Sequence, residues 1–356
     1  MKIKHRVDFR IRPFQDYTGL WKDELKDWVP DAIFDAHVHM GPPGISAEIS
    51  RERRKEPMTT FTSFTREEAD AWYENLYRGK KIAGLFAFGF PLREINITAA
   101  NDYIANLMQK EPRVKGFIIS DPKDTDRTIR QFYSVLGKGT KFSGVKPYAD
   151  LLGKSNYDTT MEEILPEEIL KFMDKERLLL MLHTTGLGMS VPENQNFVRK
   201  IVKKYAHIKV ILAHLGRFLE PKQFFDFLDS GILELPGIFL EMSSGTSVEV
   251  YERLLGREEI RTRLIFGSDI PFGLITGMEY WSEETGPTFI ARDEYPWSDA
   301  ELNRRLEDRR RYLTYNTYHV IKSFKDAVEK LKIPEEKLNR VRKDVFLNNC
   351  LRLLEP

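Results

Sequence analysis

Eight short apolar runs recur along this chain, and helical segments separate them. The runs are rich in Val, Ile, Leu and Phe, which is typical of parallel strands that are covered on both faces. Eight parallel strands joined by helices through right-handed crossovers close into a barrel. The sequence therefore predicts a (β/α)8 TIM barrel of the α/β class. We expect the strands at residues 32–38, 81–88, 113–119, 142–146, 178–182, 208–213, 237–242 and 262–268.

The segments between these runs carry signals for helices. Thr65 followed by Glu68 has the spacing of a capping box, and Pro192 and Pro221 stand where the first turn of a helix tolerates proline. These signals and the apolar spacing predict helices over residues 66–78, 95–110, 126–136, 161–175, 193–205, 222–228 and 248–255.

Four parts of the chain fall outside this repeat. Residues 1–30 form an N-terminal extension, in which residues 10–14 could add a short strand. Residues 41–65 make a long first βα loop, which is either a solvated excursion or a cover over the substrate. Residues 271–300 follow the last strand, and their dense aromatic residues indicate either a pocket wall or a subunit contact. Residues 301–356 predict two or three amphipathic helices on the outside of the barrel.

Composition limits the class of protein. The chain has 356 residues, a length that barrels reach as one unit, so residues 1–356 are expected to form a single domain. With 55 basic and 54 acidic residues the formal net charge is +1, which gives no field of one sign to attract nucleic acid or a membrane. The single cysteine, Cys350, excludes an internal disulfide, and no signal-peptide pattern opens the chain. We expect a cytoplasmic protein with a small-molecule substrate, and assembly into a homo-oligomer stays open.

Residues that can bind metal or act as bases end several of the apolar runs. The first run ends in His37 and His39, and a strand directs two residues at this spacing to the same face. Imidazole and carboxylate ligands suit zinc, manganese, iron or nickel. Because the C-terminal ends of barrel strands meet at one mouth, the residues at these ends should form one site. The later runs end in Lys146, His183, His214 and Asp269.

Four segments carry a more specific pattern: residues 34–41 (FDAHVHMG), 210–216 (VILAHLG), 264–271 (LIFGSDIP) and 346–354 (FLNNCLRLL). In this order they resemble the amidohydrolase superfamily, specifically its amidohydrolase-related (amidohydrolase 2) branch of metal-dependent TIM-barrel hydrolases. That branch includes the aminocarboxymuconate-semialdehyde decarboxylase group. The resemblance implies that His37, His39, His183 and Asp269 bind one divalent ion, zinc in the first place, with manganese, iron and nickel as alternatives. It also implies that His214 acts as an acid or base toward bound water or ligates a second ion.

Two basic residues have open roles. Binuclear relatives bridge two ions with a carbamylated lysine, and Lys146 stands at a matching place; its alternatives are to bind a substrate carboxylate or phosphate, or to form a structural salt bridge. Arg217 is a candidate anion clamp or a surface ion pair. Near the end of the seventh run, Glu241 and Ser243 could support the ligands, although a helix cap explains Ser243 equally well.

The resulting hypothesis is a metal-dependent hydrolase. Metal-bound hydroxide would attack the carbonyl carbon of an amide, lactone or ester in a small polar substrate, and Asp269 or His214 would take the proton of the water. One alternative is a non-oxidative decarboxylase that uses the same ion. The other is a metal-binding protein without turnover.

Overall fold

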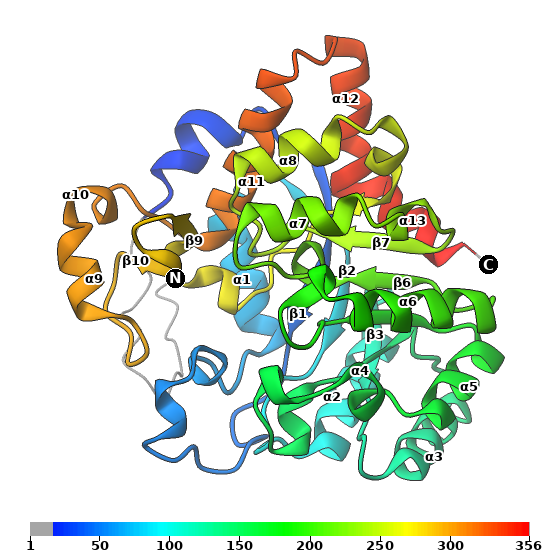
Figure 1. The fold of residues 1–356 in the computed structure, drawn as a ribbon. Helices are drawn as coiled ribbons and strands as arrows, with labels where there is room; N and C mark the ends of the chain where they lie inside the picture. Colours follow the sequence, from blue (N-terminus) through cyan, green and yellow to red (C-terminus); the bar gives the residue numbers. More distant parts are fainter. Residues whose placement is uncertain (1–16, 356) are drawn as a thin grey trace.

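The computed structural model describes residues 17–355, and eight parallel strands form the expected barrel in sequence order (Figure 1). The candidate strand at residues 10–14 lies outside the described residues. Each expected strand is present, several of them with shorter bounds. The strands are β1 Ala32–His39, β2 Lys81–Phe88, β3 Val114–Ile119, β4 Gly144–Lys146, β5 Leu179–Leu182, β6 Val210–Leu212, β7 Ile238–Glu241 and β8 Leu264–Ile265.

The barrel closes where the chain that continues from β8 meets β1. Val38 and Ile270 form a parallel bridge, and the amide of His39 donates to the carbonyl of Ile270 at 2.8 Å. Three residues earlier in β1, the amide of Ala36 donates to the carbonyl of Phe266 at 2.9 Å. These bonds bring the end of β1 beside the segment that follows β8.

The two faces of the strands belong to two apolar clusters. One cluster fills the inside of the barrel and includes Phe34, Phe86 and Ile211. The other cluster lies between the strands and the surrounding helices. It includes residues next to these in the chain, such as Ile33 and Leu85. Because both faces are buried, the strands read as continuous apolar runs.

Helices alternate with the strands, and local signals set where they begin. Thr65 and Glu68 form the predicted capping box, with the amide of Thr65 donating to the Glu68 carboxylate at 2.8 Å. The expected helix at 161–175 is broken at Pro166, since the residue before a proline disfavours the helical conformation. The helices are α1 Arg66–Leu76, α2 Ile97–Lys110, α3 Thr125–Leu136, α4 Met161–Ile164, α5 Glu167–Glu176, α6 Pro192–Lys204, α7 Pro221–Leu228 and α8 Val248–Leu255.

The chain after β8 contains more regular structure than the sequence suggested. The segment 271–300 holds an antiparallel hairpin of β9 Gly277–Ser282 and β10 Gly286–Ala291. The tail holds five α-helical segments where two or three helices were expected. Leu306 and residues 311–315 separate the first three, and a π-helical turn, Asp344–Asn348, joins the last two. The segments are α9 Ala300–Arg305, α10 Glu307–Arg310, α11 Asn316–Lys330, α12 Glu335–Lys343 and α13 Asn349–Leu354. Figure 1 shows β9, β10, α9 and α10 together at one side of the barrel.

The first βα loop is packed against the barrel, and this excludes the solvated excursion. Phe61 and Phe64 of the loop are buried, and the amide of Phe64 donates to the carbonyl of Gly41 at 2.8 Å. The guanidinium of Arg53 pairs with Glu94 at 3.0 Å and with Asp150 at 2.5 Å. The loop is therefore fixed to the segments that follow β2 and β4.

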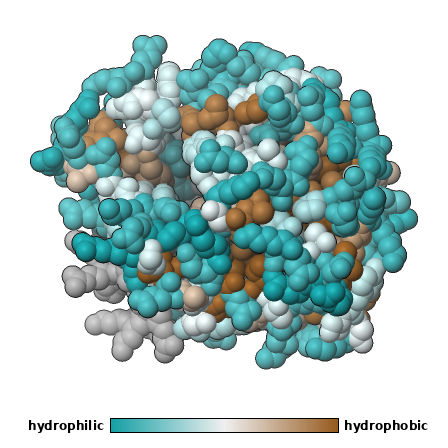
Figure 2. Space-filling view, turned by 60° about the horizontal axis from the view of Figure 1, so that its bottom comes forward, coloured by the Kyte–Doolittle hydropathy of each residue, from teal (hydrophilic) through white to brown (hydrophobic). Residues whose placement is uncertain are grey.

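The outer surface is largely polar on the side that Figure 2 draws, where apolar residues form separate patches among hydrophilic ones. Among the described residues, no helix has the length and apolar character needed to cross a membrane.

Candidate metal centre

A β-bulge in β1 turns both histidines of the pair toward the inside of the barrel. Between Asp35 and Val38 the strand advances three residues while β2 advances two, from Leu85 to Ala87. An extra residue of this kind reverses which side chains face inward. Strict alternation would have put His37 and His39 on the outer side with Asp35. The bulge puts the ring of His37 instead 5.0 Å from that of Phe88, which lies in the interior cluster.

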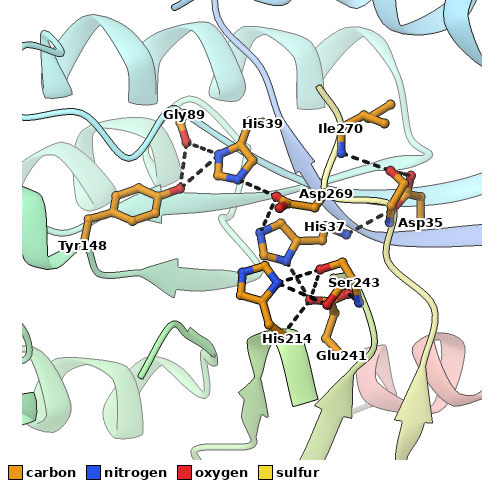
Figure 3. Close-up of polar contacts among 11 residues, drawn as sticks. Asp35, His37, His39, Gly89, Tyr148, His214, Glu241, Ser243, Asp269 and Ile270 are labelled. Atoms are coloured by element: carbon orange, nitrogen blue, oxygen red, sulfur yellow. Dashed lines mark hydrogen bonds and ion pairs between the residues drawn. The ribbon is translucent and has the colours of Figure 1, made fainter. Parts of the chain in front are cut away.

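His37, His39 and Asp269 converge on one point (Figure 3). The Nε2 atom of His39 lies 3.0 Å and that of His37 3.3 Å from Oδ1 of Asp269. Asp269 follows β8 and has a left-handed backbone with φ of 56°, a region that Asp tolerates better than most residues. The site thus combines the end of β1 with the end of β8.

The hydrogen bonds on the far side of the two rings decide which nitrogens face Asp269. Nδ1 of His39 lies 3.0 Å from the carbonyl of Gly89, which only accepts, so this nitrogen carries a proton. Nδ1 of His37 lies 2.8 Å from the carboxylate of Glu241. In the neutral rings both Nε2 atoms therefore present lone pairs to an oxygen that also carries lone pairs. A cation between the three atoms, either a shared proton or a metal ion, would remove this repulsion.

The ionisation of these groups suits a cation. Burial lowers the pKa of His37 well below its ordinary value, so the ring is neutral at neutral pH. Burial by itself would raise the pKa of Asp269, but the positive charge that His37 and His214 carry when protonated, and a hydrogen bond from His39, lower it below its usual range. Neutral imidazoles with an ionised carboxylate are the ligand set that a divalent transition metal requires.

Asp35 holds β1 and the end of β8 in register beneath this point. Its carboxylate accepts bonds from the amide of Ser268 at 2.8 Å, from the Ser268 hydroxyl at 2.5 Å and from the hydroxyl of Tyr73 on α1 at 2.8 Å. Burial raises the pKa of Asp35 to about 6, against the bonds from Ser268. The sequence motif contained Asp35, but its anchoring role was not predicted; a carboxylate inside an apolar strand was the available signal.

His214 lies beside the group, because the chain turns sharply after β6. His214 and Leu215 both have φ of 55°, and the turn brings the ring of His214 to 5.0 Å from that of His37. Nδ1 of His214 lies 2.9 Å from the hydroxyl of Ser243, which in turn donates to Glu241 at 2.8 Å. The serine that caps α8 is Ser247, so the helix-cap interpretation of Ser243 is wrong.

His183 lies on the other side of His214, with ring centroids 5.2 Å apart. Within the described residues, the groups whose ligand atoms lie close enough to share one ion do not include His183. Burial lowers the pKa of His183 well below its ordinary value, with a further contribution from the charge of Arg217. The ring is neutral and faces the same region as His214.

Lys146 ends β4 inside the barrel, and its ammonium has no hydrogen-bond partner among the described residues. It is 1% exposed, and Nζ lies 4.9 Å from the centre of the Phe88 ring. Burial lowers the pKa of Lys146 to about 8, against the charges of Asp269 and Glu241. No described carboxylate lies within salt-bridge distance of Lys146, and the charges that act on its amine are those of Asp269 and Glu241.

Arg217 does not form a surface ion pair with any described carboxylate. Its guanidinium donates to the carbonyls of Thr184 at 2.8 Å and Gly186 at 3.3 Å, in the loop that follows His183. It therefore fixes that loop, and its charge contributes to the field at His183 and His214.

The wall of the site contains aromatic residues from three loops. Tyr148, which follows β4, donates its hydroxyl to the carbonyl of Gly89 at 2.8 Å, the same oxygen that holds His39. The ring of Phe272 lies 5.1 Å from His39 and 5.6 Å from Phe61 of the first loop. The sequence predicted that aromatic residues of 271–300 form either a pocket wall or a subunit contact, and Phe272 belongs to the wall. The contacts with Phe61 and the bond from Tyr148 were not predicted, since these residues are far apart in the chain.

The sequence matches no protein-family model and no curated protein. Solved structures share the fold. ATU3138 from Agrobacterium tumefaciens is 12% identical with a TM-score of 0.53, covering 92% of this chain and 95% of its own. 2,6-Dihydroxybenzoate decarboxylase complexed with 2,6-dihydroxybenzoate is 15% identical with a TM-score of 0.52, covering 91% and 99%. The apo form of IDCase from Metarhizium anisopliae is 13% identical with a TM-score of 0.51, covering 91% and 97%. These likenesses confirm the barrel fold that the resemblance to the amidohydrolase superfamily implies.

Proposed function

We propose that this chain is a metal-dependent enzyme of the amidohydrolase superfamily that hydrolyses an amide, lactone or ester of a small polar substrate. The observation that carries the proposal is the convergence of the lone pairs of His37 and His39 on Asp269, with His214 beside them. A divalent ion bound there would polarise a carbonyl group and lower the pKa of a water molecule. Zinc is the first candidate, and manganese, iron and nickel suit the same ligands.

His214 is the proposed general base. Its Nδ1 atom is held by Ser243, so Nε2 is the nitrogen that can take a proton from water and return it to the leaving group. Burial lowers the pKa of His214 below its ordinary value, so the ring is neutral and able to accept a proton at neutral pH. Asp269 is the second candidate for the general base. It would accept the proton on the carboxylate oxygen that does not face the imidazoles. His183 is proposed to complete the ligand set once an ion is bound.

Lys146 and Arg217 are proposed to neutralise an anionic group. The unpaired ammonium of Lys146 suits a substrate carboxylate or phosphate, and it equally suits carbamylation and a bridge between two ions. Metal analysis separates these roles. Two ions per chain, reduced to one in Lys146→Ala, would support the bridge, whereas one ion in both proteins would support substrate binding.

Decarboxylation is the second candidate, and Lys146 is the observation that favours it. A buried cation near the ion can hold a substrate carboxylate, and His214 can deliver a proton to carbon. The fold is also that of 2,6-dihydroxybenzoate decarboxylase. The wider range of hydrolytic reactions on this barrel leads us to place hydrolysis first.

One experiment distinguishes the two reactions. The metal-loaded protein is incubated with lactones, esters, amides and aromatic or enoic acids in 18O-labelled water, and carbon dioxide is measured alongside. Label in the product carboxylate without carbon dioxide supports hydrolysis. Release of one carbon dioxide per substrate molecule, with deuterium from the solvent on the product carbon in a parallel run, would show decarboxylation and overturn the proposal of hydrolysis. The Asp269→Asn variant is the control, and its turnover should fall by about 10²- to 10⁴-fold if the activity belongs to this site.

A further inference from the structure

The carboxylate of Glu241 accepts four hydrogen bonds from neighbouring groups. Oε1 accepts from the amide of Ser243 at 2.5 Å. Oε2 accepts from Nδ1 of His37 at 2.8 Å, from the hydroxyl of Ser243 at 2.8 Å and from the amide of His214 at 3.3 Å. Oε1 thus accepts one bond and Oε2 accepts three, so neighbouring groups hold both oxygens of the carboxylate. It is fully buried and acts only on its neighbours.

The bond to His37 determines which nitrogen of that ring is protonated. An ionised carboxylate only accepts, so Nδ1 of His37 donates and Nε2 is left bare toward Asp269. A carboxylate behind a histidine ligand also makes the ring a stronger ligand.

The hydrogen bonds of Ser243 likewise determine which nitrogen of His214 is protonated. The serine hydroxyl has one proton, which it donates to Glu241, so it must accept from Nδ1 of His214 at 2.9 Å. The carbonyl of Ser243 lies 3.3 Å from the same nitrogen and can also only accept. Nδ1 of His214 is therefore protonated, and Nε2 is the free nitrogen (Figure 3).

Glu241 also supports the turn that places His214. A left-handed conformation at a residue other than glycine, asparagine or aspartate is costly, and two such residues follow each other at His214 and Leu215. The amide of His214 donates to Glu241 at 3.3 Å, where this turn begins.

We infer that Glu241 is a shared positioning residue, which fixes His37 directly and His214 through Ser243, so that Nε2 is the free nitrogen of both rings. The inference rests on the proposed function, because it assigns His37 to the ion and His214 to the reacting water. One buried carboxylate would thus hold a metal ligand and the general base in mutual alignment.

The first test uses the protein without metal. 15N-histidine NMR reports which ring nitrogen carries the proton, and His37→Gln and His214→Gln assign the two signals. Both rings should show a protonated Nδ1. In Ser243→Ala, His214 should become a mixture of the two neutral forms, because only the longer and weaker contact with the carbonyl of residue 243, at 3.3 Å, then remains. His37 should stay unchanged. An unprotonated Nδ1 on either ring of the unaltered protein would overturn the inference.

The second test measures zinc affinity by competition with a chelator. Glu241→Gln should weaken zinc binding by about 10- to 100-fold, as loss of a carboxylate behind a histidine ligand commonly does. Ser243→Ala should bind zinc as the unaltered protein does, and so should the control Ser247→Ala, which removes a hydroxyl from the cap of α8. Equal affinity in Glu241→Gln would overturn the inference.

The two proposals fail in different ways. If the unaltered protein binds no divalent ion, the proposed function fails, while the NMR result still tests the role of Glu241. If the protein binds zinc and Glu241→Gln binds it equally, the positioning role fails alone. The NMR test on the unaltered protein also decides the case in which Glu241→Gln does not fold.

Discussion

The indole nitrogen of Trp297 donates to the hydroxyl of Thr60 at 2.8 Å, across 237 residues of sequence. Thr60 belongs to the first βα loop and Trp297 to the segment after β8. The hydroxyl of Thr60 also donates to the carbonyl of Pro57 at 2.6 Å, and the ring of Trp297 stacks on Tyr295 at 5.0 Å. The two segments are therefore joined within one chain, and through Phe61 and Phe272 they reach the wall of the candidate site.

Loss of this bond should loosen both segments together. Trp297→Phe keeps an aromatic ring but removes the donor, and Thr60→Val removes the acceptor. Each variant should lose about 1 kcal/mol of unfolding free energy, the typical contribution of one hydrogen bond. The double variant should lose little more than either single variant. Hydrogen exchange should rise in residues 41–65 and 271–300 alike, and a rise confined to one segment would contradict the link.

Zinc should stabilise the protein through His37, His39 and Asp269. Ligand at a hundredfold excess over its dissociation constant adds about 2.7 kcal/mol to the unfolding free energy, which raises the melting temperature. Asp269→Asn should fold, since asparagine tolerates the left-handed backbone of this position, and it should lose most of that rise. His207→Gln, at an exposed histidine far from the site, is the control. An equal rise in Asp269→Asn would remove this residue from the ligand set.

Gly267 should prove necessary for the approach of Glu241 to His37. A Cβ atom at this position would lie 2.3 Å from Oε1 of Glu241 and 2.8 Å from Cβ of His37. Gly267→Ala should therefore displace both side chains and weaken zinc binding. Gly44→Ala offers a matched glycine change in open space, although its own φ of 81° adds strain there. Zinc binding in Gly44→Ala should be unchanged, and unchanged binding in Gly267→Ala would show that the site can relax around the methyl group.

His319 should make stability depend on pH. Burial lowers the pKa of His319 to about 4, and its Nε2 accepts from the amide of Thr314 at 3.0 Å. Between the ordinary histidine value of about 6.5 and pH 4, the unfolded chain binds a proton that the folded chain does not, so stability falls as the pH falls. The loss is at most about 3 kcal/mol. His319→Gln keeps an acceptor for Thr314, and urea unfolding should show a flatter pH profile in this variant. Parallel profiles would contradict the assignment.

The sequence predicted the barrel because strand burial is a local property. A parallel strand that is covered on both faces needs a continuous apolar run, and each of the eight runs could be recognised without its partners. The helix starts at Thr65, Pro192 and Pro221 depend on residues within one turn and were equally predictable. The hairpin β9–β10 was missed, since its strands are only partly buried and lack a continuous apolar run.

The candidate site was predictable in its residue types and in its place at the strand ends. His37, His39 and Asp269 meet as the order of strands required, and His214 lies beside them. What the sequence could not provide is orientation. The bulge in β1 depends on pairing with β2, and the ring of His214 is oriented by Ser243 from the end of another strand.

The sequence by itself thus determined the number and order of the strands and the residues at their ends, because hydrophobic periodicity and turn chemistry act over a few neighbours. The tertiary structure alone decided which nitrogen of each ring faces Asp269, the shared role of Glu241 and the contact between Thr60 and Trp297. Each of these depends on hydrogen bonds between residues far apart in the chain, and such bonds exist only once the barrel has closed.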